Sequence, residues 1–171
     1  MTKRTLLVLR HSKSAYPADT ADLDRPLSPR GQRDAVAAGR WLRGEGLIPD
    51  LVDCSTAERA RETWDLISDQ LGWAEQPGLV HYDPRLYEAS PGDLLAVIRE
   101  TPGEAGIVAL VGHNPGSAEL ASALTGQRGL SFPTSAVAVI GIGGGWAGVS
   151  AGSGSLATLW TPKGGSALPA G

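Results

Sequence analysis

Cysteine and histidine are scarce in this chain of 171 residues, which contains one cysteine and three histidines. The single cysteine, Cys54, excludes an internal disulfide and is typical of a reducing compartment, so we expect a cytoplasmic protein. The histidines are isolated at positions 11, 81 and 113, and they form no recognisable metal-binding motif. We therefore expect neither a metal nor another cofactor.

The chain also lacks long hydrophobic runs and a strong charge of one sign. Its first apolar run follows two basic residues, covers five residues and ends at Arg10, which fits neither a signal peptide nor a membrane span. Fifteen basic and 18 acidic residues give a net charge of −3, and no basic surface for nucleic acid follows from this. We expect no nucleic-acid partner and no membrane association.

The length favours one domain. A chain of 171 residues can bury about 70% of the surface that it exposes when unfolded, but it is short for two domains. Nine of the last 29 residues are glycine, which predicts a loose hairpin loop over residues 143–154. We predict a single domain over residues 1–163 and a flexible tail over residues 164–171.

Aliphatic runs alternate with helix-like periodicity along the chain. Strands are predicted over residues 5–9, 51–54, 79–82, 107–111, 136–142 and 156–160. Helices are predicted after Ser28, after a capping box at Ser55–Glu58, after Ser90, and over residues 115–124. This alternation predicts an α/β fold with three layers, α/β/α, in which helices cover both faces of a mostly parallel central sheet.

Two of the three histidines follow predicted buried strands. His11 comes after Arg10 at the end of the first strand, and His113 follows Gly112 at the end of the fourth. Ligands of open α/β sheets bind outside the carboxyl ends of the strands. A guanidinium matches phosphate oxygens, and a neutral imidazole can attack phosphorus. The pattern predicts a phosphate-handling enzyme, although the Arg-His pair alone also fits a solvated arginine beside a loop-capping histidine.

Arg59 strengthens the prediction of a phosphate site. It lies in the first turn of the helix after the second strand, so it is expected at the same edge of the sheet as His11. Helix amino termini favour anions. Arg61, by contrast, fits an ordinary surface arginine. Protonated His113 would add a second cationic donor, whereas neutral His113 would bond a loop carbonyl, and Asn114-Pro115 would cap the next helix in either case.

Several polar segments follow one another along the chain. They are, in order, Arg10-His11-Ser12-Lys13-Ser14, Asp24-Arg25-Pro26-Leu27-Ser28 with Arg30-Gly31, Ser55-Thr56-Ala57-Glu58-Arg59-Ala60 with Thr63, Leu86-Tyr87-Glu88, and Val111-Gly112-His113-Asn114-Pro115. Together they resemble the histidine phosphatase superfamily (phosphoglycerate mutase-like), and within it the small SixA-like phosphohistidine phosphatases. Arg-His and Gly-His-Asn-Pro are weak patterns alone, but the four motifs that begin at Arg10, Ser55, Leu86 and Val111 are specific in this order and spacing, and the segment from Asp24 also matches. The commonest first motif has glycine where this chain has Ser12; serine is typical of the small branch and disfavours a phosphoglycerate mutase.

The resemblance implies a phosphoglycerate mutase-like fold and a metal-independent phosphatase. His11 would be the nucleophile and would form a covalent phosphohistidine intermediate. Arg10, Arg59 and His113 would bind the phosphoryl group and neutralise its developing charge. Arg25 matches an arginine that approaches the phosphate in some small members. The substrate would be a phosphohistidine protein or a small phosphorylated molecule, specifically a phosphomonoester.

Glu88 is the candidate general acid. In many members of the superfamily a carboxylate near this position protonates the leaving alkoxide, whereas the smallest phosphohistidine phosphatases can lack it. Glu88 also fits a loop carboxylate near a helix amino terminus. His81 has no matching motif, and we assign it to structure.

The sequence offers two other functions for comparison, a cysteine phosphatase and a non-catalytic binding module. Cys54 does not fit a cysteine phosphatase, because four residues rather than five separate it from Arg59; a small buried hydrophobe is expected instead. A non-catalytic module of the same fold that binds phosphate or a phosphoprotein is the alternative to an enzyme.

Overall fold

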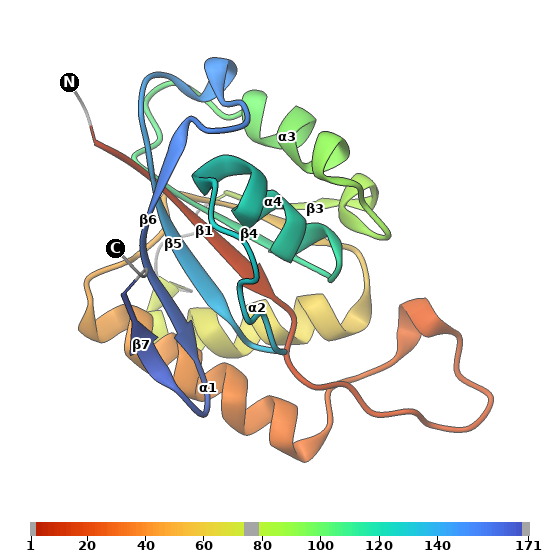
Figure 1. Ribbon diagram of the computed structural model, residues 1–171. Helices are drawn as coiled ribbons and strands as arrows, with labels where there is room; N and C mark the ends of the chain where they lie inside the picture. Colours follow the sequence, from red (N-terminus) through yellow and green to blue (C-terminus); the bar gives the residue numbers. More distant parts are fainter. Residues whose placement is uncertain (1–2, 74–78, 169–171) are drawn as a thin grey trace.

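The structure, a computed structural model, describes residues 3–73 and 79–168 (Figure 1). One seven-stranded sheet has the order β3-β2-β4-β1-β5-β6-β7. The strands are β1 (Arg4–Arg10), β2 (Leu51–Ser55), β3 (Leu79–Asp83), β4 (Ile107–Gly112), β5 (Val137–Ile142), β6 (Gly154–Thr161) and β7 (Gly165–Ala167). The helices are α1 (Pro29–Gly44), α2 (Glu58–Leu71), α3 (Pro91–Arg99) and α4 (Gly116–Thr125), with 3-10 turns η1 (Asp22–Asp24), η3 (Pro84–Leu86) and η4 (Trp146–Gly148).

The sheet is mixed. Strands β3, β2, β4 and β1 are parallel to one another, and they form the half of the sheet that carries the motifs. Strands β5, β6 and β7 extend the other half antiparallel, because a direct return rather than a helical crossover joins them. The predicted α/β fold is confirmed, and its parallel part is the half nearer to β3.

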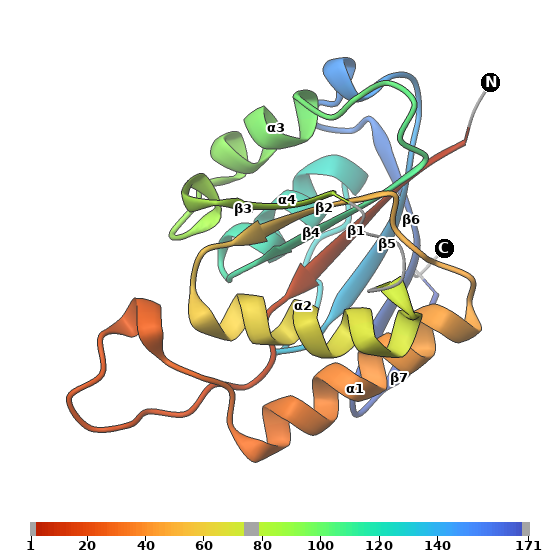
Figure 2. The same ribbon diagram turned by 180° about the vertical axis from the view of Figure 1, so that it is seen from behind.

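Helices cover both faces of the sheet (Figures 1 and 2). In β1, Leu6 and Val8 join the buried cluster under α3 and α4, whereas Leu7 and Leu9 join the cluster under α1 and α2. A strand buried on both faces reads as a continuous aliphatic run, as predicted for this segment. Each fully buried leucine contributes about 1.5–3 kcal/mol to folding. Among the described residues, no helix is both long and apolar enough to cross a membrane.

The predicted capping box at Ser55 is wrong. Strand β2 continues through Ser55, and helix α2 begins at Glu58 after Ala57, with no side-chain cap. The Ser55 hydroxyl instead accepts a hydrogen bond from the Ala57 N–H at 3.2 Å and contacts His113. Because β2 is one residue longer than predicted, Ser55 lies at the carboxyl end of this strand and not at the start of the helix.

The carboxyl-terminal segment is more ordered than predicted. Within the predicted tail, Gly165–Ala167 form β7 along β6, and the Thr158 hydroxyl donates to the Ala167 carbonyl at 3.0 Å. Residues 169–171 of that predicted tail lie outside the described residues. The glycine-rich loop over residues 143–154 contains η4, where buried Trp146 donates its indole N–H to the Ala105 carbonyl at 2.7 Å. Burial of one large aromatic ring thus fixes a segment whose glycines predicted looseness.

Helix α1 begins directly against the loop that follows β1. The Ser28 N–H and hydroxyl both donate to the Lys13 carbonyl, at 2.9 and 3.1 Å, and the Ser28 hydroxyl accepts from the Gly31 N–H at 3.1 Å. A Cβ atom on Gly31 would overlap that same Lys13 carbonyl oxygen. The loop after His11 therefore packs where only glycine fits.

We predict that Gly31→Ala lowers the free energy of unfolding by about 1–3 kcal/mol, because the new methyl group overlaps backbone atoms. The matched control is Gly44→Ala at the other end of α1, where an added Cβ meets no atom within 4 Å. That control is expected to be neutral or to stabilise by up to about 1 kcal/mol. Urea unfolding of both variants measures the difference, and equal stabilities would contradict the packing argument.

Candidate active site

The register of β1 against β4 brings two histidines together. Arg10 pairs with Gly112 across the two parallel strands, so His11 and His113 are each the next residue. The His11 N–H donates to the Gly112 carbonyl at 2.9 Å and continues the ladder by one bond. The imidazole centroids lie 5.0 Å apart, close to the roughly 4.8 Å spacing of adjacent strands. The predicted convergence of these two residues follows from strand pairing.

His11 is held as a neutral imidazole of one tautomer. Its Nδ1 lies 2.7 Å from the Ser12 carbonyl oxygen. A carbonyl only accepts hydrogen bonds, so Nδ1 carries the proton and Nε2 keeps its lone pair. Only 8% of the residue is exposed, and burial is the main cause that lowers the pKa of His11 to about 3. A neutral ring with a free Nε2 lone pair is the form required of a nucleophile.

The loop after His11 is fixed from two directions. The Ser12 N–H donates to the Thr63 hydroxyl at 2.9 Å, and that hydroxyl donates to the Arg59 carbonyl of α2 at 2.6 Å. On the other side, Ser12 and Ser135 share a hydroxyl hydrogen bond of 2.6 Å, and the Ser135 N–H donates to the His11 carbonyl at 3.1 Å. Ser135 adopts a φ of 67°, a left-handed conformation that is uncommon for serine. These contacts fix the backbone on both sides of His11.

His113 faces the same site from β4. Its Nε2 shares a 2.7 Å hydrogen bond with the Ser55 hydroxyl, and its ring meets the ring of Tyr87 edge-on at 5.6 Å. Burial, followed by the nearby charge of Arg59, lowers the pKa of His113 to about 4. His113 is therefore neutral at pH 7 in the unliganded site. A bound phosphoryl group would favour its protonation, because an opposite charge nearby stabilises the cation.

Arg59 lies in the first turn of α2, as predicted, and its guanidinium is bound by Asp22. Arg59 Nη1 donates to the Asp22 backbone carbonyl at 2.6 Å, and Nη2 donates to the carboxylate Oδ2 at 3.1 Å. The Tyr87 hydroxyl donates to the same Oδ2 at 2.5 Å, and Arg25 Nη1 donates to Oδ1 at 2.9 Å. The Tyr87 hydrogen bond, followed by the Arg25 one, holds the pKa of Asp22 far below its ordinary value. The Asp22 carboxylate is therefore ionised. It contacts the same guanidinium that an oxygen of a phosphoryl group would contact.

The other two predicted arginines are placed differently. Arg10 donates to the Phe132 carbonyl at 3.0 Å, and burial lowers its pKa; its buried Nε has no partner among the described residues. The Arg25 guanidinium donates to the Ser14 hydroxyl and to the Ala15 carbonyl. Arg25 does not line the cleft described next, and it reaches the site only through Asp22.

A cleft of about 460 Å³ opens beside these groups. Its lining residues are Asp22, Arg59, Tyr87, Glu88, Ala89, Ser90, Pro91, His113, Asn114, Pro115, Gly116 and Glu119. The predicted acid Glu88 is exposed at this cleft and has a φ of 53°. A left-handed backbone costs a non-glycine residue about 1–2 kcal/mol. Glu88 thus lies at the cleft in a backbone conformation that glycine would adopt at a lower free-energy cost.

Sequence reasoning missed Asp22 as a site residue and gave Ser55 a different role. Asp22 lies in an exposed loop and carries no motif or periodicity of its own. It contacts Arg59 only because the chain folds back across 37 positions. No local signal in the sequence indicates such a contact.

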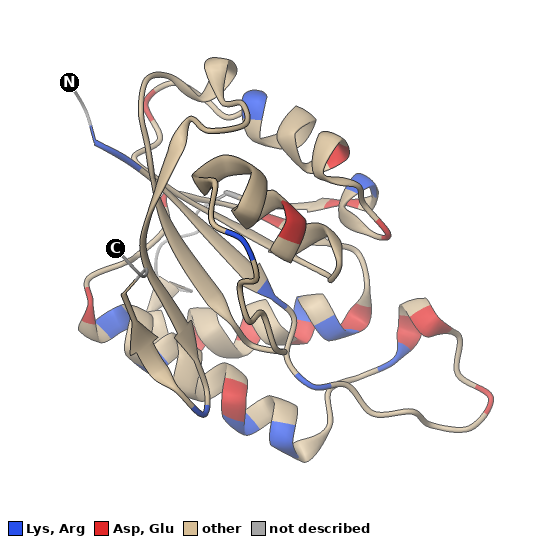
Figure 3. Cartoon of the chain, viewed as in Figure 1, with Lys and Arg blue, Asp and Glu red and all other residues tan. Residues whose placement is uncertain are grey.

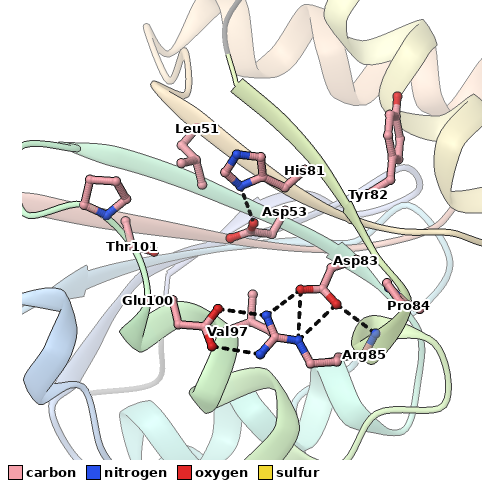
Figure 4. Close-up of a pocket in the computed structure, with 11 residues that line it drawn as sticks. Leu51, Asp53, His81, Tyr82, Asp83, Pro84, Arg85, Val97, Glu100 and Thr101 are labelled. Carbon is pink, nitrogen blue, oxygen red and sulfur yellow. Dashed lines mark hydrogen bonds and ion pairs between the residues drawn. The ribbon is translucent and has the colours of Figure 1, made fainter.

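A second cleft, of about 750 Å³, lies between the β3 edge and α3 (Figure 4). His81 Nδ1 lies 3.4 Å from Asp53 Oδ1 there, and Arg85 bridges Asp83 and Glu100 at 2.7 and 2.8 Å. Arg85 in this cleft is thus bound by two carboxylates. The smaller cleft is the better candidate for phosphoryl chemistry, because His113 and Arg59 line it and the ring of His11, which is not itself a lining residue, lies 5.0 Å from that of His113. Among residues 3–73 and 79–168, no group of three or more His, Cys, Asp or Glu side chains is placed to hold a metal ion.

Comparison with known proteins gives consistent matches. The model of the histidine phosphatase superfamily (branch 1) matches residues 6–114. An uncharacterized protein of Mycobacterium tuberculosis is 38% identical over 165 residues, which cover 91% of this chain and 100% of that protein. A candidate phosphohistidine phosphatase SixA of Nakamurella multipartitia superposes with a TM-score of 0.83 at 30% identity, covering 94% of this chain and 96% of that one. Its counterpart from Agrobacterium tumefaciens gives 0.75 at 29% identity, covering 81% and 92%.

We predict that His11 and His113 stay neutral well below pH 6.5. Both pKa values are lowered by burial, to about 3 and about 4, so the folded protein takes up these protons only near those values. The two histidines of the unfolded chain take up protons from about pH 6.5 downward. The free energy of unfolding is therefore unaffected by these groups above pH 6.5, and it decreases as the pH falls from 6.5 toward the lowered pKa values of the folded protein. Nitrogen-15 NMR of the rings at pH 5.5, assigned with single histidine variants, checks the prediction. Imidazolium shifts for both rings at that pH would contradict it.

Proposed function

The chain belongs to the histidine phosphatase superfamily, branch 1, and on this basis we propose that it is a metal-independent phosphatase with His11 as its nucleophile. The observation that carries the proposal is the fixed tautomer of His11: its Nδ1 is 2.7 Å from a carbonyl oxygen, which leaves the Nε2 lone pair available. The neighbouring His113 ring, 5.0 Å away, supplies a second polar group at the same point.

The proposed reaction has two displacements. In the first, the Nε2 lone pair forms a bond to phosphorus while the bond between phosphorus and the leaving group breaks; the leaving group keeps that electron pair and takes up a proton. In the second, water attacks phosphorus, the P–N bond breaks, and neutral His11 and inorganic phosphate result. Phosphoryl transfer needs in-line positioning and stabilisation of the oxygens, which Arg10, Arg59 and His113 would provide.

We propose a phosphohistidine protein or a small phosphomonoester as substrate. The two solved relatives of about 30% identity bear the description of phosphohistidine phosphatases, which supports the first class. Glu88 at the cleft supports the second class, because an alkoxide leaving group needs a proton donor. The single cysteine supports the expectation of a cytoplasmic location.

We predict that His11→Asn abolishes turnover of an aryl phosphate and of a phosphohistidine peptide, because the covalent route is lost. His81→Asn is the matched control and is expected to keep wild-type turnover, since His81 lines the other cleft. Steady-state assays in EDTA, with circular dichroism to verify folding, measure both variants. Residual activity above a few per cent of wild type in the His11 variant would contradict the proposal that His11 is the nucleophile.

The same assays test the alternative of a non-catalytic binding module. Such a module would turn over no substrate as wild type, and its affinity for a phosphate ligand would depend on Arg10 and Arg59. Arg61→Ala is the matched control for Arg59→Ala, because Arg61 donates to the Thr56 carbonyl and lies over the Tyr82 ring, 4.1 Å from its centroid.

We predict a graded loss of activity for Glu88→Gln, which keeps the size of the side chain but removes the proton donor. General acid assistance contributes about 10²- to 10⁴-fold, so turnover of an alkyl phosphate should fall by that order. Turnover of an aryl phosphate or phosphohistidine should change little, because these groups leave easily. Equal loss on all three substrates would indicate binding instead, and no loss on any would place Glu88 outside the reaction.

A further inference from the structure

The cleft that His113 and Arg59 line, next to His11, has an acidic rim. Three carboxylates line it, from Asp22, Glu88 and Glu119, against the one guanidinium of Arg59. They come from separate elements: η1, the loop after η3, and the first turn of α4. Figure 3 shows the acidic positions on η1 and α4. A site that receives an anion would be expected to have cations at its mouth, so this balance of charge requires an explanation.

The positive charge of Arg59 is already matched within the protein. Asp22 accepts from its guanidinium through both the backbone carbonyl and the carboxylate. Glu88 and Glu119 are exposed, and neither side chain has a hydrogen-bond or ion-pair partner in the part of the chain that the structure describes. The outer cleft therefore presents two uncompensated negative charges to anything that enters.

Ordinary structural roles do not account for all three carboxylates. Glu119 lies in the first turn of α4, where an acidic residue stabilises the helix. That role does not extend to Glu88, which lies outside any helix and adopts a φ of 53°. Asp22 has a structural role of another kind, because its carboxylate accepts hydrogen bonds from Arg59, Arg25 and Tyr87. Their shared property is that they face one cleft.

We infer that this acidic rim selects substrates in which the phosphoryl group lies beside cationic groups and discriminates against those that carry further anionic groups. The inference rests on the proposed phosphatase function and specifies its substrate class: a phosphorylated protein segment with lysine or arginine next to the phosphorylated residue. Nucleotides and bisphosphorylated sugars would place a second anion against Glu88 and Glu119.

The test compares two phosphohistidine peptides of equal length, one with lysine and one with glutamate on both sides of the phosphorylated residue. At low salt, the full chain is expected to have a higher kcat/KM for the lysine peptide. Each ion pair between a peptide lysine and a rim glutamate should contribute a factor of about two to five, which is the effect of an exposed ion pair. The preference should fall as salt screens the charges. Equal kcat/KM for the two peptides at low salt would overturn the inference.

Glu119 provides the variant, because it has no part in the proposed chemistry. Glu119→Gln should reduce the preference and Glu119→Lys should reverse part of it, whereas turnover of an aryl phosphate by Glu119→Gln should stay within about twofold of wild type. Glu104→Lys, in the exposed loop before β4, makes the same charge change away from the cleft and should alter nothing. An equal effect of Glu104→Lys would assign the preference to net charge rather than to the rim, and would overturn the inference.

Binding separates this inference from the proposed function. The same two peptides, carrying a non-hydrolysable phosphonate analogue of phosphohistidine, are titrated by calorimetry. Tighter binding of the lysine peptide supports selection by the acidic rim, whether or not the substrate is turned over. Tighter binding without turnover would overturn only the phosphatase proposal. Equal affinities together with normal turnover would overturn only the rim.

Discussion

Parallel pairing in exact register between β1 and β4 is the constraint on which the site depends. Because Arg10 lies opposite Gly112, the residues that follow them are separated by one strand spacing, and this alone places the two imidazoles 5.0 Å apart. A shift by one residue would exchange the aliphatic side chains of β1 between the two buried clusters, where each would meet neighbours that do not match its shape. The two apolar cores therefore protect the geometry of the histidine pair.

The electrostatics of the site follow from burial. Withdrawing His11 and His113 from water lowers both pKa values and gives two neutral rings beside fixed guanidinium groups. In the unliganded protein Asp22 supplies the negative charge that Arg59 requires. In the proposed reaction, a phosphoryl group bound to Arg59 would take the place of the Asp22 carboxylate, so the charge around the guanidinium would change little. The Asp22 carboxylate and the substrate would then be alternative ligands of one cation.

Much of the fold could be predicted from the sequence because buried parallel strands and capped helices leave local patterns. The helix starts at Ser28 and Ser90 and the strand ends at Arg10 and Gly112 are of this kind. The convergence of His11, Arg59 and His113 followed from the same patterns. The contact of Asp22 with Arg59, the pairing of β7 and the burial of Trp146 depend on residues distant in sequence, which no local window contains. The misplaced capping box at Ser55 shows that a single residue of strand extension changes a side chain's role.

The central position of β1 has a consequence for how the molecule assembles. This strand is made early, yet its partners β4 and β5 follow roughly 100 and 130 residues later along the chain. Closing loops of that length costs chain entropy before any strand contact compensates for it, so folding is governed by long-range encounters. During synthesis, the aliphatic segment that precedes His11 has no strand partner until roughly 100 further residues have been made, and it is then an exposed template for association with other chains. The order of the sheet thus leaves β1 without both of its partners until β5 is present, and the histidine pair can form only once β4 has been made.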